Sequence, residues 1–196
     1  MLWKGLVYGT ITSPTTQRIW IDRNLGASQV CTALDDAACY GDYYQWGRGA
    51  DGHEKATSTT TSIQTTSTIP GNSSFITQVY NGTADWTSAD TDGTLRSTEW
   101  SKTDGSSICP VGFRVPTQNE ITLELAAISN SDDAFNILKL PLSGYRNFDD
   151  GLITRDFASS IWMSDAYINT LDYYASDAYT LSNVYSYGNT VRCIKD

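Results

Sequence analysis

The sequence predicts an α+β domain with a small antiparallel sheet, one main helix and long irregular loops. A clear helical period occurs in one segment, at about residues 117–129, and the strand-like segments are all short. Only 18% of the residues are charged, whereas Gly, Ser, Thr and Tyr are plentiful, which is typical of an irregular, loop-rich domain. A chain of 196 residues suits one domain, 1–196.

The first half of the chain predicts few regular elements. Residues 1–17 read as a lead-in strand or linker, and residues 18–22 alternate apolar and polar side chains as a half-buried strand does. Residues 40–49 are dense in aromatic rings and glycines, which predicts rings in the core and close approach of the backbone. Residues 55–74 form a Ser/Thr-rich tract with few apolar side chains, which predicts an exposed insertion.

The helix at about 117–129 has a start signal in the sequence. Thr117 and Glu120 have the spacing of a capping box, in which each side chain accepts a hydrogen bond from a free amide at the helix start. Ile121, Leu125 and Ile128 then recur on one face, and we expect the helix to end near residue 130.

Shorter elements follow this helix. Residues 132–138 predict a short helical turn, and Asp150-Gly151 predicts the turn of a β-hairpin. Residues 160–164, 179–181 and 190–195 predict the last strands.

The net charge and the hydropathy of the chain argue against two kinds of partner, nucleic acid and the membrane interior. The net charge of −9 argues against nucleic acid, because phosphate binding needs clusters of Lys and Arg. No apolar run approaches the ~20 residues that a transmembrane helix needs, so we expect no membrane insertion.

The four cysteines, Cys31, Cys39, Cys109 and Cys193, lack a C-x-x-C spacing, which argues against a zinc or redox site. We favour two disulfides, Cys31–Cys39 and Cys109–Cys193, although three pairings are formally possible and free buried thiols are the alternative. Two disulfides would place the protein outside a reducing cytosol.

The segment from residue 164 to 190 has the composition of a binding surface. Of its 27 residues, 22 are Ala, Asp, Asn, Ser, Thr or Tyr, and it holds six of the chain's twelve tyrosines. Tyrosine gives a large, rigid contact surface, and Ser, Asn and Asp add adaptable hydrogen bonding. We therefore expect these side chains to point outward, and the replacement of Tyr167, Tyr174 or Tyr185 to abolish binding without loss of stability.

Six blocks in order resemble the Fibrobacter succinogenes major paralogous domain family over roughly residues 18–196: RIWIDRNLGA, YGDYYQWGR, CPVGFRVPTQNE, LKLPLSGYRNFDDG, SSIWMSD and GNTVRCIKD. The resemblance implies a C-type-lectin-like fold, in which a small twisted antiparallel sheet and one or two helices support a large loop region. Similar domains are the variable proteins of diversity-generating retroelements, and others occur on phage tail fibres and bacterial surface proteins.

The resemblance implies a division of the chain into scaffold and binding positions, and it also supports the pairing Cys109–Cys193. The scaffold would comprise Trp20, Asp22, Asn24, Trp46, Arg48, Arg114, Pro116, Trp162 and Arg192. The ligand-binding positions would be Ser164, Asp165, Tyr167, Asn169, Asp172, Tyr173, Tyr174, Tyr179, Asn183, Tyr185, Ser186 and Tyr187.

The resemblance predicts a non-enzymatic domain in an extracellular setting, on a cell surface or virion, as part of a larger fibre or surface protein. Its ligand would be a cell-surface protein or a glycan. The bias toward Tyr, Asn, Asp, Ser, Thr and Ala is also the product of adenine-directed mutagenesis at AAY codons, which favours diversification by a retroelement.

Two other functions are weighed against ligand binding. The first is a structural domain that oligomerises a fibre tip. The second is an oxidase of the formylglycine-generating type, which would need reactive cysteines, whereas Cys109 and Cys193 lie in scaffold-like blocks.

We expect no cofactor. The triplets of calcium-dependent sugar-binding lectins are missing, although Asp149, Asp150 or the Asp90/Asp92 pair could hold a structural calcium. His53, the one histidine, is expected to be a surface residue.

Overall fold

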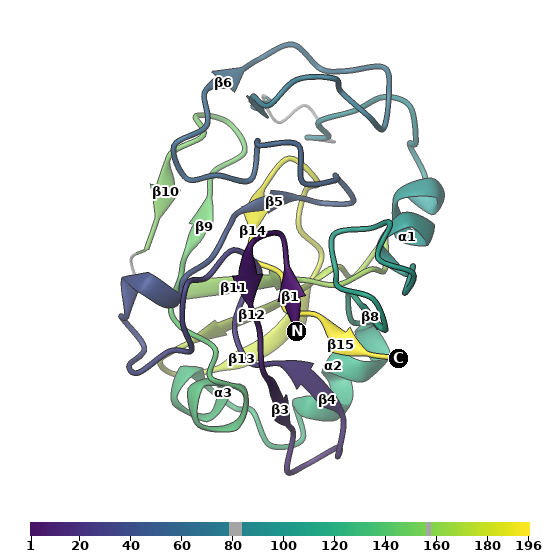
Figure 1. Ribbon diagram of the computed structural model, residues 1–196. Helices are drawn as coiled ribbons and strands as arrows, with labels where there is room; N and C mark the ends of the chain where they lie inside the picture. Colours follow the sequence, from purple (N-terminus) through teal and green to yellow (C-terminus); the bar gives the residue numbers. More distant parts are fainter. Residues whose placement is uncertain (79–83, 156–157) are drawn as a thin grey trace.

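The computed structural model describes residues 1–78, 84–155 and 158–196 (Figure 1). Among these residues the helices are short: α1 spans Thr94–Trp100, α2 Gln118–Glu124 and α3 Ser131–Leu138, and a 3₁₀ turn covers Ala37–Cys39. The strands are β1 Leu2–Trp3, β2 Leu6–Val7, β3 Thr10–Thr12, β4 Ile19–Ile21, β5 Tyr44–Gln45, β6 Thr60–Thr61, β7 Phe75–Ile76, β8 Phe113–Arg114, β9 Tyr145–Arg146, β10 Ile153–Thr154, β11 Ala158–Trp162, β12 Thr170–Tyr174, β13 Ala178–Leu181, β14 Gly188–Asn189 and β15 Ile194–Lys195.

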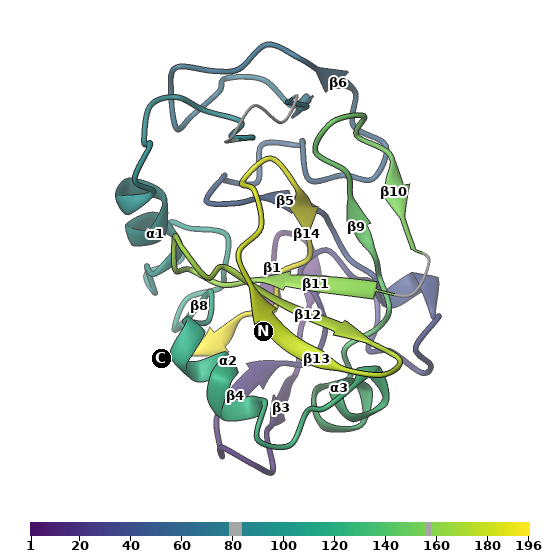
Figure 2. The same cartoon turned by 180° about the vertical axis from the view of Figure 1, so that it is seen from behind.

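The α+β class predicted from the sequence is confirmed, but its regular part differs from the expected single sheet and main helix. The described strands form several small sheets, with strand orders β3-β4-β15-β8, β10-β9-β14-β5 and β11-β12-β13, plus the pairs β1-β2 and β6-β7. All pairings within these sheets are antiparallel except β6 with β7. Seen from behind, the β11-β12-β13 sheet lies in the middle of the molecule, above α2 and α3 (Figure 2).

Two clusters of buried side chains hold these sheets together. One cluster joins β4, β15, β11 and β12 to the helices α2 and α3, through residues such as Trp20, Ile121, Leu138, Ile161 and Leu171. The other is largely aromatic and lies around Trp46, Trp100 and Trp162, which are all fully buried. Three buried indoles in one cluster account for much of its apolar area, since each aromatic ring buries roughly 150–250 Å².

Helix α2 begins as the sequence predicts and ends earlier. Thr117 caps it, and both hydrogen bonds of the capping box with Glu120 are present. The predicted end near residue 129 is wrong, because the helix stops at Glu124, whose carboxylate accepts hydrogen bonds from Ser13 Oγ at 2.6 Å and Trp20 Nε1 at 3.2 Å. Asn130 then caps α3, which confirms a helical turn at 132–138.

The scaffold residues implied by the resemblance are packed inside the molecule or half-buried at its edge. Arg192 is fully buried and donates to the carbonyls of Leu138 at 2.7 Å and Lys139 at 3.1 Å, and to Asn24 Oδ1 at 3.2 Å. Burial lowers the pKa of Arg192 to about 10. Because three separate segments meet at this guanidinium, it fixes the C-terminal strand against α3.

Both favoured disulfides are present. Cys31 pairs with Cys39 across the 3₁₀ turn, and Cys109 pairs with Cys193, so that the described cysteines include no free thiol. All four cysteines are buried. None of the described helices has both the length and the apolar character that a membrane-spanning segment requires.

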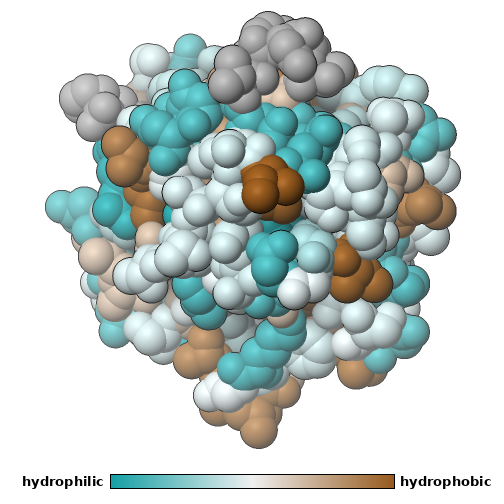
Figure 3. Space-filling model, turned by 90° about the horizontal axis from the view of Figure 1, so that it is seen from above, coloured by the Kyte–Doolittle hydropathy of each residue, from teal (hydrophilic) through white to brown (hydrophobic). Residues whose placement is uncertain are grey.

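The N-terminal segment is part of the domain rather than a linker, because β3 pairs along its whole length with β4. The Ser/Thr-rich segment 55–74 contains no buried residue, as predicted, and β6 within it pairs with β7. On the face that includes this segment, hydrophobic residues stand apart from one another among hydrophilic and neutral ones (Figure 3).

Candidate ligand-binding site

The twelve predicted binding residues divide into three groups by exposure. Tyr167 and Tyr179 are exposed, at 79% and 40% of their full surface. The half-buried group comprises Asp165, Tyr174, Asn183, Tyr185 and Tyr187. The buried group comprises Ser164, Asn169, Asp172, Tyr173 and Ser186.

The buried group corrects the prediction that this whole segment points outward. Strand β12 alternates, so Leu171 and Tyr173 face the core, and the Tyr173 hydroxyl donates to the carbonyl of Pro141 at 2.7 Å. Asn169 is buried because its side chain exchanges two hydrogen bonds with the backbone of Asn183, at 2.8 and 2.9 Å. Side chains with these roles point inward and hold the sheet and its loop together.

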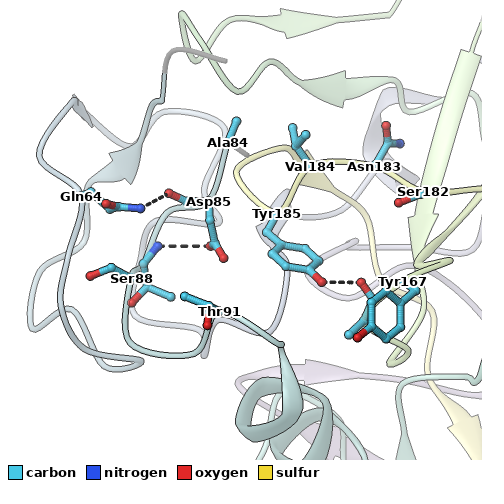
Figure 4. Close-up of a pocket in the computed structure, with 12 residues that line it drawn as sticks. Gln64, Ala84, Asp85, Ser88, Thr91, Tyr167, Ser182, Asn183, Val184 and Tyr185 are labelled. Carbon is cyan, nitrogen blue, oxygen red and sulfur yellow. Dashed lines mark hydrogen bonds between the residues drawn. The ribbon is translucent and has the colours of Figure 1, made fainter. Parts of the chain in front are cut away.

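The exposed ring of Tyr167 lies between two pockets. The first has a volume of about 420 Å³ and is shown in Figure 4. One wall comes from the predicted segment, through Ala166, Tyr167, Ser182, Asn183, Val184 and Tyr185. The opposite wall comes from Gln64, Ala84, Asp85, Thr87, Ser88 and Thr91.

Two residues of this lining, Asp85 and Tyr185, contact a buried ion-pair network around Arg96 of α1. The fully buried guanidinium donates to both carboxylate oxygens of Asp85, at 2.7 and 2.8 Å, and from Nε to Asp90 Oδ2 at 3.1 Å. It also lies over the rings of Trp46 and Trp86, at 5.0 and 5.3 Å from their centroids. Such a charge is stable inside a protein when it is paired and hydrogen-bonded, as it is here.

The backbone at Gly47 lies close against the side chain of Arg96, which makes this arrangement possible. Gly47 has φ +72°, a conformation that favours glycine, and a Cβ there would lie 2.3 Å from Cβ of Arg96. The glycines of residues 40–49 were expected to permit such an approach, and Gly47 confirms it.

Tyr185 links the Arg96 network to the rest of the predicted segment. Its ring stacks on Trp46 with centroids 4.4 Å apart and an interplanar angle of 21°, and Arg96 lies 4.7 Å from its centroid. Its hydroxyl donates to the carbonyl of Ala166, next to Tyr167 (Figure 4). Burial raises the pKa of Tyr185, so the hydroxyl stays a donor at neutral pH.

The second pocket, of about 340 Å³, lies on the other side of Tyr167 between that loop and the starts of α1 and α2. Its lining includes Asp92, Gln118, Asp165 and Tyr167. Asp165 Oδ2 accepts a hydrogen bond from the backbone amide of Gln118 at 2.5 Å, so this carboxylate also satisfies a free amide at the start of α2.

The remaining predicted tyrosines lie outside both pockets. Tyr174 and Tyr179 stack on each other across β12 and β13, with centroids 5.8 Å apart. Tyr187 packs edge-to-face against Tyr145 and Phe148, at 5.5 and 4.9 Å. The structure therefore brings Asp165, Tyr167, Asn183 and Tyr185 together around the pockets, and places the other exposed rings elsewhere.

His53 is not a surface residue, contrary to the sequence prediction. It is fully buried: Nδ1 lies 2.7 Å from Asp51 Oδ1, and Nε2 accepts a hydrogen bond from the amide of Gln45 at 3.0 Å. Burial lowers the pKa of His53 to about 4, against the opposing effect of Asp51. Asp51, His53 and Glu54 are near enough to share a metal ion, but both imidazole nitrogens already have protein partners.

In the acidic pair Asp90/Asp92, the Asp90 carboxylate is engaged by hydrogen bonds within the chain. The oxygens of Asp90 accept hydrogen bonds from the amides of Leu95 and Arg96, at 3.1 and 2.9 Å, in addition to the Arg96 side chain. A calcium ion needs several free oxygens at once. A calcium at Asp149 or Asp150 stays a prediction.

Sequence reasoning missed the wall formed by residues 84–91 and the cation beneath it. Arg96 and Asp85 lie in a segment without a capping signal: Gly93 precedes α1 and supplies no side-chain cap. Their contact with Trp46 and Tyr185 links segments far apart in the chain, so no local pattern could have found it. In the comparisons with known proteins, no family model, curated protein or solved structure matches this chain.

Proposed function

We propose that this chain is a non-enzymatic ligand-binding domain of the C-type-lectin-like class, and that Tyr167 and its two pockets are its binding surface. The observation that carries the proposal is the exposure of Tyr167, at 79%, between two concave sites. A large aromatic ring left in water next to a cavity is the usual anchor of a binding surface, since anchors of this kind dominate interface energies.

The rigidity of the surroundings supports this role. Tyr185 and Arg96 fix the loop that includes Tyr167 from below, and Asp165 fixes it to α2. A surface held in place before the ligand arrives loses less conformational entropy on binding. Substitution at exposed positions such as Tyr167 and Tyr179 needs no repacking of the core, which fits a domain whose ligand contacts vary.

The proposed biological setting rests on the resemblance of the sequence to the Fibrobacter succinogenes major paralogous domain family. We place the domain on a phage tail fibre or a bacterial surface protein, and two buried disulfides support an extracellular location. Diversification by a retroelement would act at exposed positions such as Tyr167 and Tyr179. The buried residues of the segment, Asn169 and Tyr173 among them, would have to keep their identity.

The oxidase alternative is disfavoured by the cysteines. Cys109 and Cys193 are joined to each other and fully buried within the aromatic core. Intact-mass measurement with and without an alkylating agent tests this directly. Alkylation of either cysteine in the native protein would show a free thiol and would favour the oxidase alternative.

The test of the binding function compares Tyr167→Ala with Leu152→Ala. Both side chains are exposed, at 79% and 67%, but Leu152 lines neither pocket. The wild-type protein is screened against a glycan array and a displayed random peptide library, and each ligand found is measured against both variants. We expect Tyr167→Ala to lose binding at least tenfold and Leu152→Ala to keep it.

The same proteins test the alternative of a structural, oligomerising domain. A stable oligomer in light scattering that Tyr167→Ala converts to a monomer, without any ligand in the screens, would favour the alternative over ligand binding. A monomer that binds through Tyr167 favours the proposal.

A further inference from the structure

The charges around Tyr167 all have one sign at the surface. Asp85 lines the first pocket, and Asp92 and Asp165 line the second. Among the described residues that line either pocket, none is Lys, Arg or His. A ligand that enters the second pocket therefore meets two carboxylates without a paired cation, whereas Asp85 of the first pocket is paired with the buried Arg96.

At the first pocket, Arg96 reduces the negative charge but does not cancel it. Its side chain has no exposed surface, and it pairs with both Asp85 and Asp90, so the buried cluster keeps one net negative charge. Asp92 and Asp165 accept hydrogen bonds from the backbone amides of Thr94 and Gln118, at 3.1 and 2.5 Å. Neither forms an ion pair with a described residue, so their charges face whatever occupies the second pocket.

Aromatic rings add to the attraction for a cation. Tyr167 lines both pockets, and Tyr185 lines the first. A guanidinium or ammonium group over a tyrosine face is attracted by the ring quadrupole, and a nearby carboxylate strengthens its binding. Exposed hydroxyl and amide groups of Gln64, Ser88 and Thr91 line the rim and can bond to a peptide backbone.

We infer that the ligand is a polypeptide segment that crosses Tyr167 and places Lys or Arg side chains in the flanking pockets. This inference rests on the proposed binding function and specifies its ligand. Acidic glycans and phosphorylated ligands would meet like charges, which disfavour them. Neutral glycans would leave the carboxylates without a counter-charge, whereas basic side chains occur in most polypeptides.

The test uses the full chain and a random peptide library displayed on phage, panned in parallel with a glycan array. We expect Lys and Arg to be enriched in the selected peptides over the unselected library. The best peptide is then synthesised, and its affinity is measured at low and high salt, because attraction between exposed charges is screened by salt. We expect a clear loss of affinity as salt rises.

Paired variants separate local charge from net charge. Asp92→Asn with Asp165→Asn removes two charges at the pockets and keeps an oxygen that can accept the amide hydrogen bonds. Asp35→Asn with Asp132→Asn makes the same change in net charge at exposed positions that line neither pocket. We expect the first pair to weaken the basic peptide roughly three- to tenfold and the second to change its affinity less than twofold.

The outcomes distinguish this inference from the function on which it rests. The selected ligands could be glycans, or peptides without enrichment in Lys or Arg. If these ligands bind the wild type but not Tyr167→Ala, the inference is overturned and the binding function stands. Equal effects of the two charge pairs would also overturn it. If neither library yields a ligand that depends on Tyr167, both the inference and the binding function fail.

Discussion

The phenol ring of Tyr185, which lines the first pocket, stacks on the indole of Trp46 with their centroids 4.4 Å apart. Trp46 is fully buried in the aromatic core, whereas Tyr185 belongs to the Tyr-, Ser- and Asn-rich segment 164–190. The contact with this rigid core therefore holds the loop next to Tyr167 in place.

Tyr185 and Tyr167 should respond differently to truncation. Tyr185→Ala loses the stack and the hydrogen bond to Ala166, so we expect the free energy of unfolding to fall by roughly 2 kcal/mol. Tyr167→Ala removes an exposed ring and should change it by less than ~0.5 kcal/mol. Urea denaturation measures both, and Tyr185→Phe, which keeps the stack, serves as the control. Equal losses for the two alanine variants would contradict the assigned roles, and equally small ones would support the sequence-based expectation that Tyr185 is dispensable for stability.

Arg96 should be indispensable to the fold. Arg96→Met would leave the carboxylates of Asp85 and Asp90 in place without their shared cation, at a cost of about 3–5 kcal/mol. Arg96→Lys keeps one charge but not the bidentate geometry, and we expect an intermediate loss. We expect the melting temperature to fall in the order wild type, Arg96→Lys, Arg96→Met, as measured by thermal unfolding. A Met variant as stable as wild type would show that the network contributes nothing.

The pH dependence of stability should carry a signature of His53. Its pKa is about 4 in the fold, below its ordinary value of 6.5, so the unfolded chain takes up a proton at higher pH than the folded one. The contribution of His53 to stability is therefore complete above about pH 6.5 and is lost progressively as the pH falls toward 4. Since the chain has one histidine, its NMR signals can be followed directly, and we expect no titration above about pH 5.

His53→Gln provides the control for that measurement. The difference in unfolding free energy between wild type and this variant should shrink as the pH falls from 6.5 to 4. A histidine titrating near 6.5 in the folded protein would refute the buried, neutral state.

The two disulfides should contribute unequally. Cys109–Cys193 closes a loop of 84 residues in sequence separation and Cys31–Cys39 one of 8, which in the chain-entropy model correspond to roughly 4–5 and 2–3 kcal/mol. We expect the double variant of Cys109 and Cys193 to alanine to lose its cooperative unfolding transition, and that of Cys31 and Cys39 to keep it at lower denaturant. Calorimetry on the two variants decides the order.

The sequence alone determined the features that depend on near neighbours. The capping box of Thr117 and Glu120 marked the start of α2, because both hydrogen bonds close within three residues. The predicted hairpin at Asp150-Gly151 is present between β9 and β10, and Gly151 has φ +71°, a conformation that favours glycine. The exposure of residues 55–74 followed from their lack of apolar side chains.

Tertiary contacts decided the rest. Strand β12 was not predicted, because its tyrosines suggested an outward surface, and only pairing with β11 and β13 turns Tyr173 inward and leaves Tyr179 outside. His53, surrounded in sequence by charged residues, is buried because Gln45 and Asp51 satisfy both ring nitrogens. Composition fixed which residue types are available for binding. The folded chain decided which of them reach solvent, since burial depends on partners far along the chain, as Trp46 is for Tyr185.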